Sequence, residues 1–185
     1  MAAYIISIDQ SSQGTKALLF DETGTIVRRT DCAHRQIVNE KGWVSHDPEE
    51  IYRNVLTVVS KLLEGIDANC VVGVGISNQR ETTVAWNKIT GKPYGNAVVW
   101  QCARATKICE RESIVLMADA IQKKTGMNLS PYFPAAKLTW ILENEEGAKE
   151  AAGKHEICHG TMDSWLVYKL TGGKEYRTDY SNASR

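Results

Sequence analysis

Three short apolar segments separated by tight polar turns open the chain before any helical pattern begins. They span residues 4–9, 16–21 and 25–29, and each is rich in β-branched or other apolar side chains. Such segments joined by short turns predict three antiparallel strands in a meander. A doubly wound nucleotide-binding sheet would place a helix directly after its first strand, whereas helical spacing first appears here after Asp47. The opening therefore argues against that architecture.

A helix, a further strand and several more helices are predicted to follow. Asp47 suits the N-cap of the first helix, Pro48 its first position and Gly65 its end. An apolar run at residues 71–76 predicts a buried strand. Further helices are predicted over residues 103–124, 135–152 and 162–170. This order of elements is that of the ribonuclease-H-like (actin-like ATPase) domain, an α/β fold whose first hairpin turn embraces phosphates.

The last predicted strand runs directly into a polar block, residues 78–81, where core residues would be expected. Ligands of open α/β sheets lie at the carboxyl ends of strands, which is where this block would stand. Arg80 offers donors beside the acceptor Glu81, and a polyhydroxy ligand needs both because each hydroxyl donates and accepts. The alternative is a surface ion pair of little energetic value. Trp86 and Trp100, which flank the block, favour a binding site.

A second candidate binding residue, Tyr132, lies in a loop between two predicted helices. Pro131 and Pro134 bracket Tyr132 and Phe133 and restrict the backbone there. The alternative role for Tyr132 is packing within a surface loop.

The turn after the first predicted strand is rich in hydroxyl-bearing and small residues. Its backbone N–H groups and hydroxyls could bind a phosphate, and Asp9 at its start could hold a hydrated Mg²⁺. Lys16 adds a positive charge just behind the turn. The alternative is an ordinary hairpin turn with a solvent-facing Asp9. The glycine and lysine spacing is not that of a P-loop.

Charge and composition exclude several classes of function. Lys plus Arg equals Asp plus Glu at 22 each, so no broad basic surface suggests nucleic acid as a partner. The longest apolar runs are far too short to span a bilayer, and no signal peptide is recognisable at the first residues. The five cysteines are scattered without zinc spacing, which is typical of free thiols in a reducing compartment. We therefore expect a cytoplasmic protein.

With these pieces assembled, the chain resembles the N-terminal portion of the FGGY carbohydrate kinase family, and within it the branch that phosphorylates glycerol. The resemblance covers essentially all 185 residues. Its most specific blocks are residues 75–83, 96–102, 131–133 and 178–185. It implies ATP-dependent, Mg²⁺-assisted phosphorylation of a terminal hydroxyl of glycerol, and a homo-oligomer in the full-length form.

The resemblance also assigns roles to single residues. Arg80, Glu81 and Tyr132 match the family's glycerol-binding positions, and Trp100 matches an aromatic residue that lines the carbon backbone of the substrate. Asp9 corresponds to the acid near the metal.

The phosphate-contacting turn corresponds to Ser12, Gln13, Gly14, Thr15 and Lys16. Here the sequence departs from the family pattern, which usually reads Asp-Gln-Gly-Thr. Ser11 replaces the glycine, Ser12 keeps a hydroxyl where threonine is usual, and Lys16 stands where arginine is common.

Two parts of the family's machinery are expected outside this chain. The resemblance implies that the catalytic aspartate lies beyond Arg185 and that the adenosine pocket belongs to a second, nucleotide-binding domain. Residues 1–185 would then be a truncated N-terminal kinase domain, incomplete at its C-terminal end and inactive alone. A kinase for another polyol or sugar of the same family, and a non-catalytic module that binds a polyol or a partner protein, are the alternatives.

Overall fold

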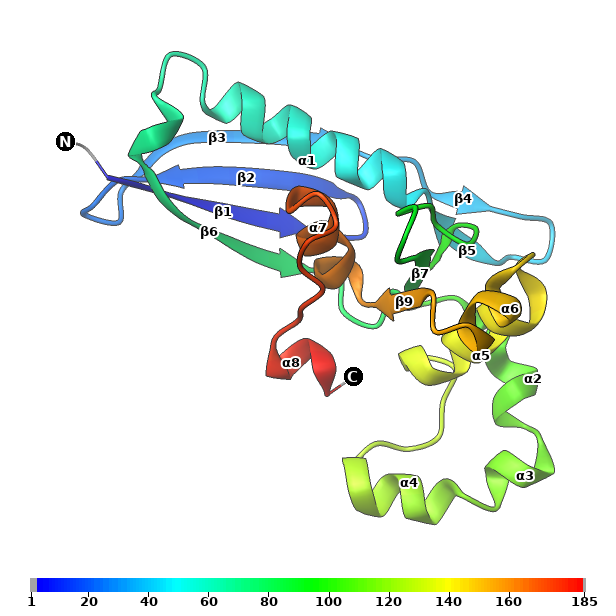
Figure 1. Cartoon of the computed structure of the whole chain (residues 1–185). Coiled ribbons are helices and arrows are strands. Elements are labelled where there is room, and N and C mark those ends of the chain that lie inside the picture. The colour runs from blue at the N-terminus through cyan, green and yellow to red at the C-terminus, as the bar shows by residue number, and fades with distance from the viewer. Residues whose placement is uncertain (1–2, 185) are drawn as a thin grey trace.

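The computed structural model describes residues 3–184, and a four-stranded sheet forms its centre. The strands are β1 (Tyr4–Gln10), β2 (Gly14–Phe20), β3 (Ile26–Ala33) and β6 (Val71–Asn78), in the order β3-β2-β1-β6. The first three strands pair antiparallel, which confirms the predicted meander, and β6 pairs parallel to β1 (Figure 1). Because β1 and β6 run the same way, their carboxyl ends meet at one edge of the sheet, with Gln10 opposite Asn78.

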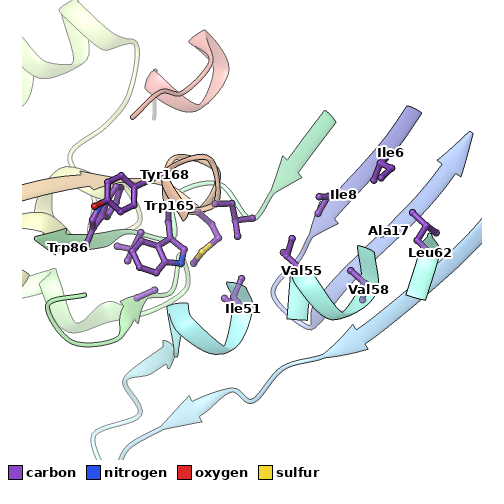
Figure 2. Packing of buried hydrophobic residues seen from close by; sticks show 14 of the residues in the cluster. Ile6, Ile8, Ala17, Ile51, Val55, Val58, Leu62, Trp86, Trp165 and Tyr168 are labelled. Carbon is purple, nitrogen blue, oxygen red and sulfur yellow. The ribbon is translucent and has the colours of Figure 1, made fainter. Parts of the chain in front are cut away.

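One long helix, α1 (Pro48–Leu62), lies across one face of the sheet over β2 and β3 (Figure 1). It begins as predicted, because the Asp47 carboxylate accepts a hydrogen bond from the Glu49 N–H at 2.8 Å and Pro48 takes the first helical position. Its apolar stripe meets the inward side chains of the strands, as Figure 2 shows. The residues in this contact are Ile51, Val55, Val58 and Leu62 of α1 and Ile6, Ile8, Ala17 and Leu19 of the sheet, all of them buried.

The core continues beyond the sheet into a cluster of aromatic rings. Trp165 and Tyr168 of α7 (Met162–Leu170) pack with Trp86 of β7 (Val84–Asn87), and the Trp86 and Trp165 ring centroids are 5.3 Å apart (Figure 2). Trp86 is fully buried in this cluster. The expectation that it flanks a binding site is therefore wrong, because its ring points into the core.

Smaller elements complete the fold around a second hydrophobic cluster. Its buried residues are Val44, Ala85, Val98, Val99, Cys102, Ile141 and Ala148. β4 (Ile37–Val38), β5 (Val44–His46) and β8 (Ala97–Val98) form a three-stranded sheet, and β7 pairs with β9 (Ile157–Gly160). The remaining helices are α2 (Thr106–Cys109), α3 (Glu112–Val115), α4 (Ala118–Thr125), α5 (Pro134–Asn144), α6 (Ala148–Gly153) and α8 (Tyr180–Ala183), with short 3₁₀ turns at Ala68–Cys70 and Ala103–Ala105. Within residues 3–184, no helix combines the length and the apolar character needed to cross a membrane.

Two predicted helices are broken in the structure, whereas the one at residues 162–170 is confirmed. The segment after residue 103 forms the separate helices α2, α3 and α4 and extends away from the sheet (Figure 1). Most of its side chains are exposed, so no packed face stabilises one continuous helix there. The helix predicted over residues 135–152 ends at Asn144, where Glu145 adopts an extended conformation, and resumes at Ala148 after the left-handed Gly147 with φ of 76°.

Candidate functional site

A cavity of about 260 Å³ lies where the carboxyl ends of β1 and β6 meet. It is lined by Asp9, Ser11, Ser12, Asn78, Gln79, Arg80, Glu81, Trp100 and Tyr132. The structure thus brings together all four residues predicted to bind a polyol. They come from three separate stretches of the chain, namely the turn after β6, the segment after β8 and the loop before α5.

The turn that carries Arg80 and Glu81 has an unusual backbone. Glu81 has a φ of 60°, in the left-handed region that residues other than glycine rarely adopt, and only 3% of the residue is exposed. The neighbouring Arg80 is exposed at the mouth of the cavity. Strain of this kind persists only where surrounding contacts determine it, and it is frequent at ligand-binding sites.

Hydrogen bonds around Thr82 determine the conformation of this turn. The Thr82 hydroxyl donates to Gln79 Oε1 at 2.9 Å and accepts from the Trp100 N–H at 3.1 Å. Thr83 and Val98 exchange two backbone hydrogen bonds, of 3.0 and 2.8 Å. The turn is therefore tied to the segment that carries Trp100, so the polar and the aromatic sides of the cavity keep a defined separation.

Two aromatic rings form one wall of the cavity. The ring centroids of Trp100 and Tyr132 are 5.9 Å apart and the ring planes are inclined at 65°. The Tyr132 hydroxyl donates to Glu81 Oε2 at 3.3 Å, so the loop before α5 touches the turn after β6. An apolar wall beside a carboxylate can cover the carbon atoms of a polyol while the carboxylate accepts from its hydroxyls.

Gln79 links the two strand ends beneath the cavity. Its backbone N–H donates to the Gln10 carbonyl at 2.7 Å, and its side-chain Nε2 lies 2.9 Å from Gln10 Oε1 and 3.2 Å from His46 Nδ1. Because the amide donates to Nδ1, His46 carries its proton on Nε2. Burial, together with the adjacent His34, lowers the pKa of His46 to about 4. Burial also lowers the pKa of His34, whose ring centroid is 4.4 Å from that of His46.

The predicted phosphate-binding turn is divided between two cavities. Ser12 borders the 260 Å³ cavity, where its Oγ accepts from Trp100 Nε1 at 2.8 Å. The other four residues, Gln13, Gly14, Thr15 and Lys16, border a separate cavity of about 130 Å³ formed with β3. Within the turn, both the N–H and the hydroxyl of Ser11 donate to the Gly14 carbonyl, at 2.9 and 3.0 Å, so neither group is directed at a ligand.

Position 14 must be a glycine for a structural reason that the sequence did not reveal. A Cβ atom at this position would lie 2.7 Å from the backbone oxygen of Cys32. The close approach of β3 to β2 therefore requires a glycine here, independently of any nucleotide.

The carboxylate of Asp9 is the candidate metal ligand in this cavity. No cluster of three or more His, Cys, Asp and Glu side chains that could hold a metal occurs in the described part of the chain. Mg²⁺ needs no such cluster, because it is commonly bound by one or two carboxylates, water and substrate phosphates. Asp9 lines the cavity, and Lys16 stands opposite it in the register of β1 and β2. A single carboxylate suits a metal whose other ligands are water and the phosphates of a bound ligand.

Three residues that position the site were not singled out in the sequence. Gln79 belongs to the polar block and Thr82 follows it directly, but both act inside the turn, where they also bond to distant segments. Lys137 of α5 is fully buried behind the aromatic wall. The available signal was a lysine within the first turn of a helix with apolar neighbours, which is not specific enough to predict burial.

Comparison with known proteins shows the class to which this fold and site belong. The model of the FGGY family of carbohydrate kinases, N-terminal domain, matches residues 4–185. The chain therefore belongs to the FGGY family of carbohydrate kinases.

Within that family the chain is most informatively compared with glycerol kinases. Glycerol kinase 1 of Thermotoga maritima is 50% identical over 184 residues, which are 98% of this chain and 37% of that protein. The crystal structure of Plasmodium falciparum glycerol kinase with ADP aligns with a TM-score of 0.88 and 36% identity, covering 100% of this chain and 37% of the other. This chain thus spans a little over a third of the length of the glycerol kinases it matches.

More distant structures support the fold alone. Gluconate kinase from Lactobacillus acidophilus aligns with a TM-score of 0.84 at 24% identity, covering 100% of this chain and 36% of that one. Together with the glycerol kinase structure, it confirms the expected α/β fold of the ribonuclease-H-like (actin-like ATPase) type.

Proposed function

We propose that this chain supplies the polyol-binding part of an ATP-dependent glycerol kinase. The observation that carries the proposal is the arrangement of Arg80, Glu81, Trp100 and Tyr132 around one cavity of about 260 Å³. Their identities match the family's glycerol-binding positions, and the two glycerol kinases compared above are 36 and 50% identical to this chain over the aligned part, which is 37% of each of them.

The cavity has the chemistry and the size that a small polyol requires. Glu81 accepts hydrogen bonds from hydroxyl groups, Arg80 donates to their oxygen atoms, and the rings of Trp100 and Tyr132 cover the C–H edge of the ligand. A volume of about 260 Å³ is below the range typical of sites for drug-sized ligands, which suits a three-carbon substrate better than a long sugar chain.

ATP and Mg²⁺ are the proposed cofactors of the reaction. Asp9 would hold the hydrated ion at the edge of the cavity, and Ser12 would face the transferred phosphate. When bound, Mg²⁺ neutralises the charge of the phosphates during transfer. The chain's own residues bind the polyol, orient its terminal hydroxyl toward Ser12 and exclude water along the aromatic wall.

The general base and the adenosine pocket are proposed to lie outside residues 1–185, the segment that we assign to the N-terminal kinase domain. Two acids near the C-terminal end are engaged in local structure instead. The Asp163 carboxylate accepts from the hydroxyls of Thr161 and Thr178, and Asp179 caps α8. Hydrogen bonds from Asn182 lower the pKa of Asp179. We therefore expect no phosphorylation of glycerol by the isolated chain, and we propose that the full-length form is a cytoplasmic homo-oligomer.

Titration calorimetry of the chain with glycerol, erythritol and xylulose tests the proposal. Glycerol should bind most tightly, Glu81→Ala should abolish the binding heat, and Glu112→Ala on the exposed helix α3 should leave it unchanged. Tighter binding of erythritol or of the ketose xylulose would replace glycerol by another substrate of the family. Binding that survives Glu81→Ala would refute the assignment of the site.

A further inference from the structure

A buried lysine stands behind the aromatic wall of the cavity. Lys137 lies in the first turn of α5 and is 0% exposed, although lysine is rarely buried without a partner. The titratable groups that act on its ammonium are Glu81, from the turn after β6, and the thiols of Cys102 and Cys109.

The direct contacts of Lys137 are with Tyr132. Its Nζ donates to the backbone carbonyl of Tyr132 and lies 5.7 Å from the centroid of the Tyr132 ring. The hydroxyl of the same ring donates to Glu81 at 3.3 Å. One ammonium group thus holds the backbone of Tyr132 and is also attracted to the carboxylate that this ring contacts.

We propose that Lys137 is a positioning residue for the polyol site, whose positive charge holds Tyr132 in place and compensates the buried carboxylate of Glu81. The inference rests on the proposed function of the cavity and adds to it a residue that does not touch the ligand.

The cost of burying this charge supports a role in the site rather than in stability. Burial lowers the pKa of Lys137 to about 8, and the attraction of Cys102, Glu81 and Cys109 offsets only part of that effect. An apolar side chain of similar volume would avoid the cost of desolvation, as replacements of buried charges commonly do. The positive charge of Lys137 therefore acts in the site, on Tyr132 and Glu81, rather than in the stability of the fold.

The test compares Lys137→Met, which keeps the volume and removes the charge, with Lys137→Arg, which keeps the charge at every accessible pH. Lys123→Met, on the exposed surface of α4, is the matched control. The first readout is the glycerol dissociation constant from pH 6.5 to 9.5. The second is amide hydrogen exchange of residues 127–133, which requires no ligand.

We expect glycerol affinity of the unsubstituted chain to fall as the pH rises through about 8, where Lys137 loses its proton. Lys137→Met should bind roughly tenfold more weakly without this pH dependence, as loss of a charged hydrogen bond predicts. In this variant, the amide hydrogens of residues 127–133 should also exchange at least about fivefold faster. Lys137→Arg should restore slow exchange and bind with constant affinity over the same pH range.

Unchanged exchange and unchanged affinity in Lys137→Met would overturn the proposal. A chain that does not bind glycerol at any pH would instead refute the proposed function. In that case the exchange rates of residues 127–133 alone decide whether Lys137 positions Tyr132.

Discussion

The indole Nε1 of Trp100 donates a hydrogen bond to Ser12 Oγ at 2.8 Å. This contact joins the aromatic wall of the 260 Å³ cavity to the turn that is proposed to face the transferred phosphate. The Ser12 hydroxyl keeps its own hydrogen to donate elsewhere, since it acts as the acceptor toward the indole. A position where the family usually has threonine therefore serves both parts of the site.

Trp100→Phe should weaken glycerol binding by about two- to fivefold, because it keeps an aromatic ring but loses one neutral hydrogen bond and part of the indole surface. Ser12→Ala should have a similar effect, since it removes the other partner of the same bond. The two effects should be strongly non-additive in the double variant, as expected for groups in direct contact. Calorimetric titration of all three variants measures the coupling, and simple additivity would show that the bond contributes nothing to affinity.

Glu81→Gln should reduce glycerol affinity by roughly 10- to 100-fold, because a hydrogen bond to a carboxylate is worth about 1.5–3 kcal/mol. The amide keeps the size of the side chain, so the folded structure should persist. Titration calorimetry gives the affinity and circular dichroism checks the fold. Wild-type affinity in this variant would mean that the carboxylate faces no hydroxyl.

The free energy of unfolding should fall as the pH decreases from 6.5 toward 4. The pKa of His46 is lowered from 6.5 to about 4 in the folded protein, so the unfolded chain binds more protons in this interval. The contribution of His46 to the free energy of unfolding is fully present above pH 6.5 and declines as the pH falls from 6.5 to 4. Below pH 4, His46 causes no further change. The loss should amount to about 3 kcal/mol, with a further contribution from His34 in the same direction.

Urea denaturation at several pH values measures this loss. His46→Gln should flatten the pH dependence, because a glutamine cannot take up the proton. His155→Gln, at an exposed position, should leave the pH dependence as it is. If the free energy of unfolding changes with pH equally in His46→Gln and in the unsubstituted chain, the pH dependence comes from other groups.

Two glycines of the central sheet should respond oppositely to replacement by alanine. Gly14→Ala would bring a Cβ to 2.7 Å from the backbone oxygen of Cys32 and should destabilise the fold by about 1–3 kcal/mol. Gly73→Ala in β6 meets no atom within 4 Å and should stabilise it by roughly 0.5 kcal/mol. Thermal unfolding of both variants is the measurement. Equal destabilisation would show that strand pairing at Gly14 is not the cause.

Local signals predicted much of the fold. The meander, the capped start of α1, the strand β6 and the helix α7 all follow from patterns a few residues apart, and the structure confirms these elements. The predicted burial of β6 is wrong, because β6 is an edge strand on which Val72 and Val74 are exposed. The breaks between α2, α3 and α4 could not be predicted, because they reflect missing tertiary packing rather than a local stop signal. Gly147 was a visible break signal, but a glycine inside a helical pattern is also tolerated.

The sequence predicted which residues lie together in the candidate site better than it predicted how they are buried and arranged. The polar block after β6 indicated Arg80 and Glu81, and both line the same cavity as Trp100 and Tyr132. The burial of Trp86 and of Lys137 depends on which faces meet in three dimensions, which residue spacing does not encode. For the same reason, the separation of Ser12 from Lys16 became apparent only when the cavities could be compared.

The single amide of Gln79 has a consequence for how this domain can vary. The Gln79 side chain contacts the end of β1, the turn that carries Glu81, and the ring of His46. His46 must stay neutral, because only the neutral ring can accept a hydrogen bond from the Gln79 amide. A replacement of Gln79 would disturb all three contacts at once, so none of them can be altered separately through this residue. Changes in polyol preference should therefore arise at Arg80, at the mouth of the cavity, or at Tyr132, in its wall, while the contacts of Gln79 beneath the cavity stay unchanged.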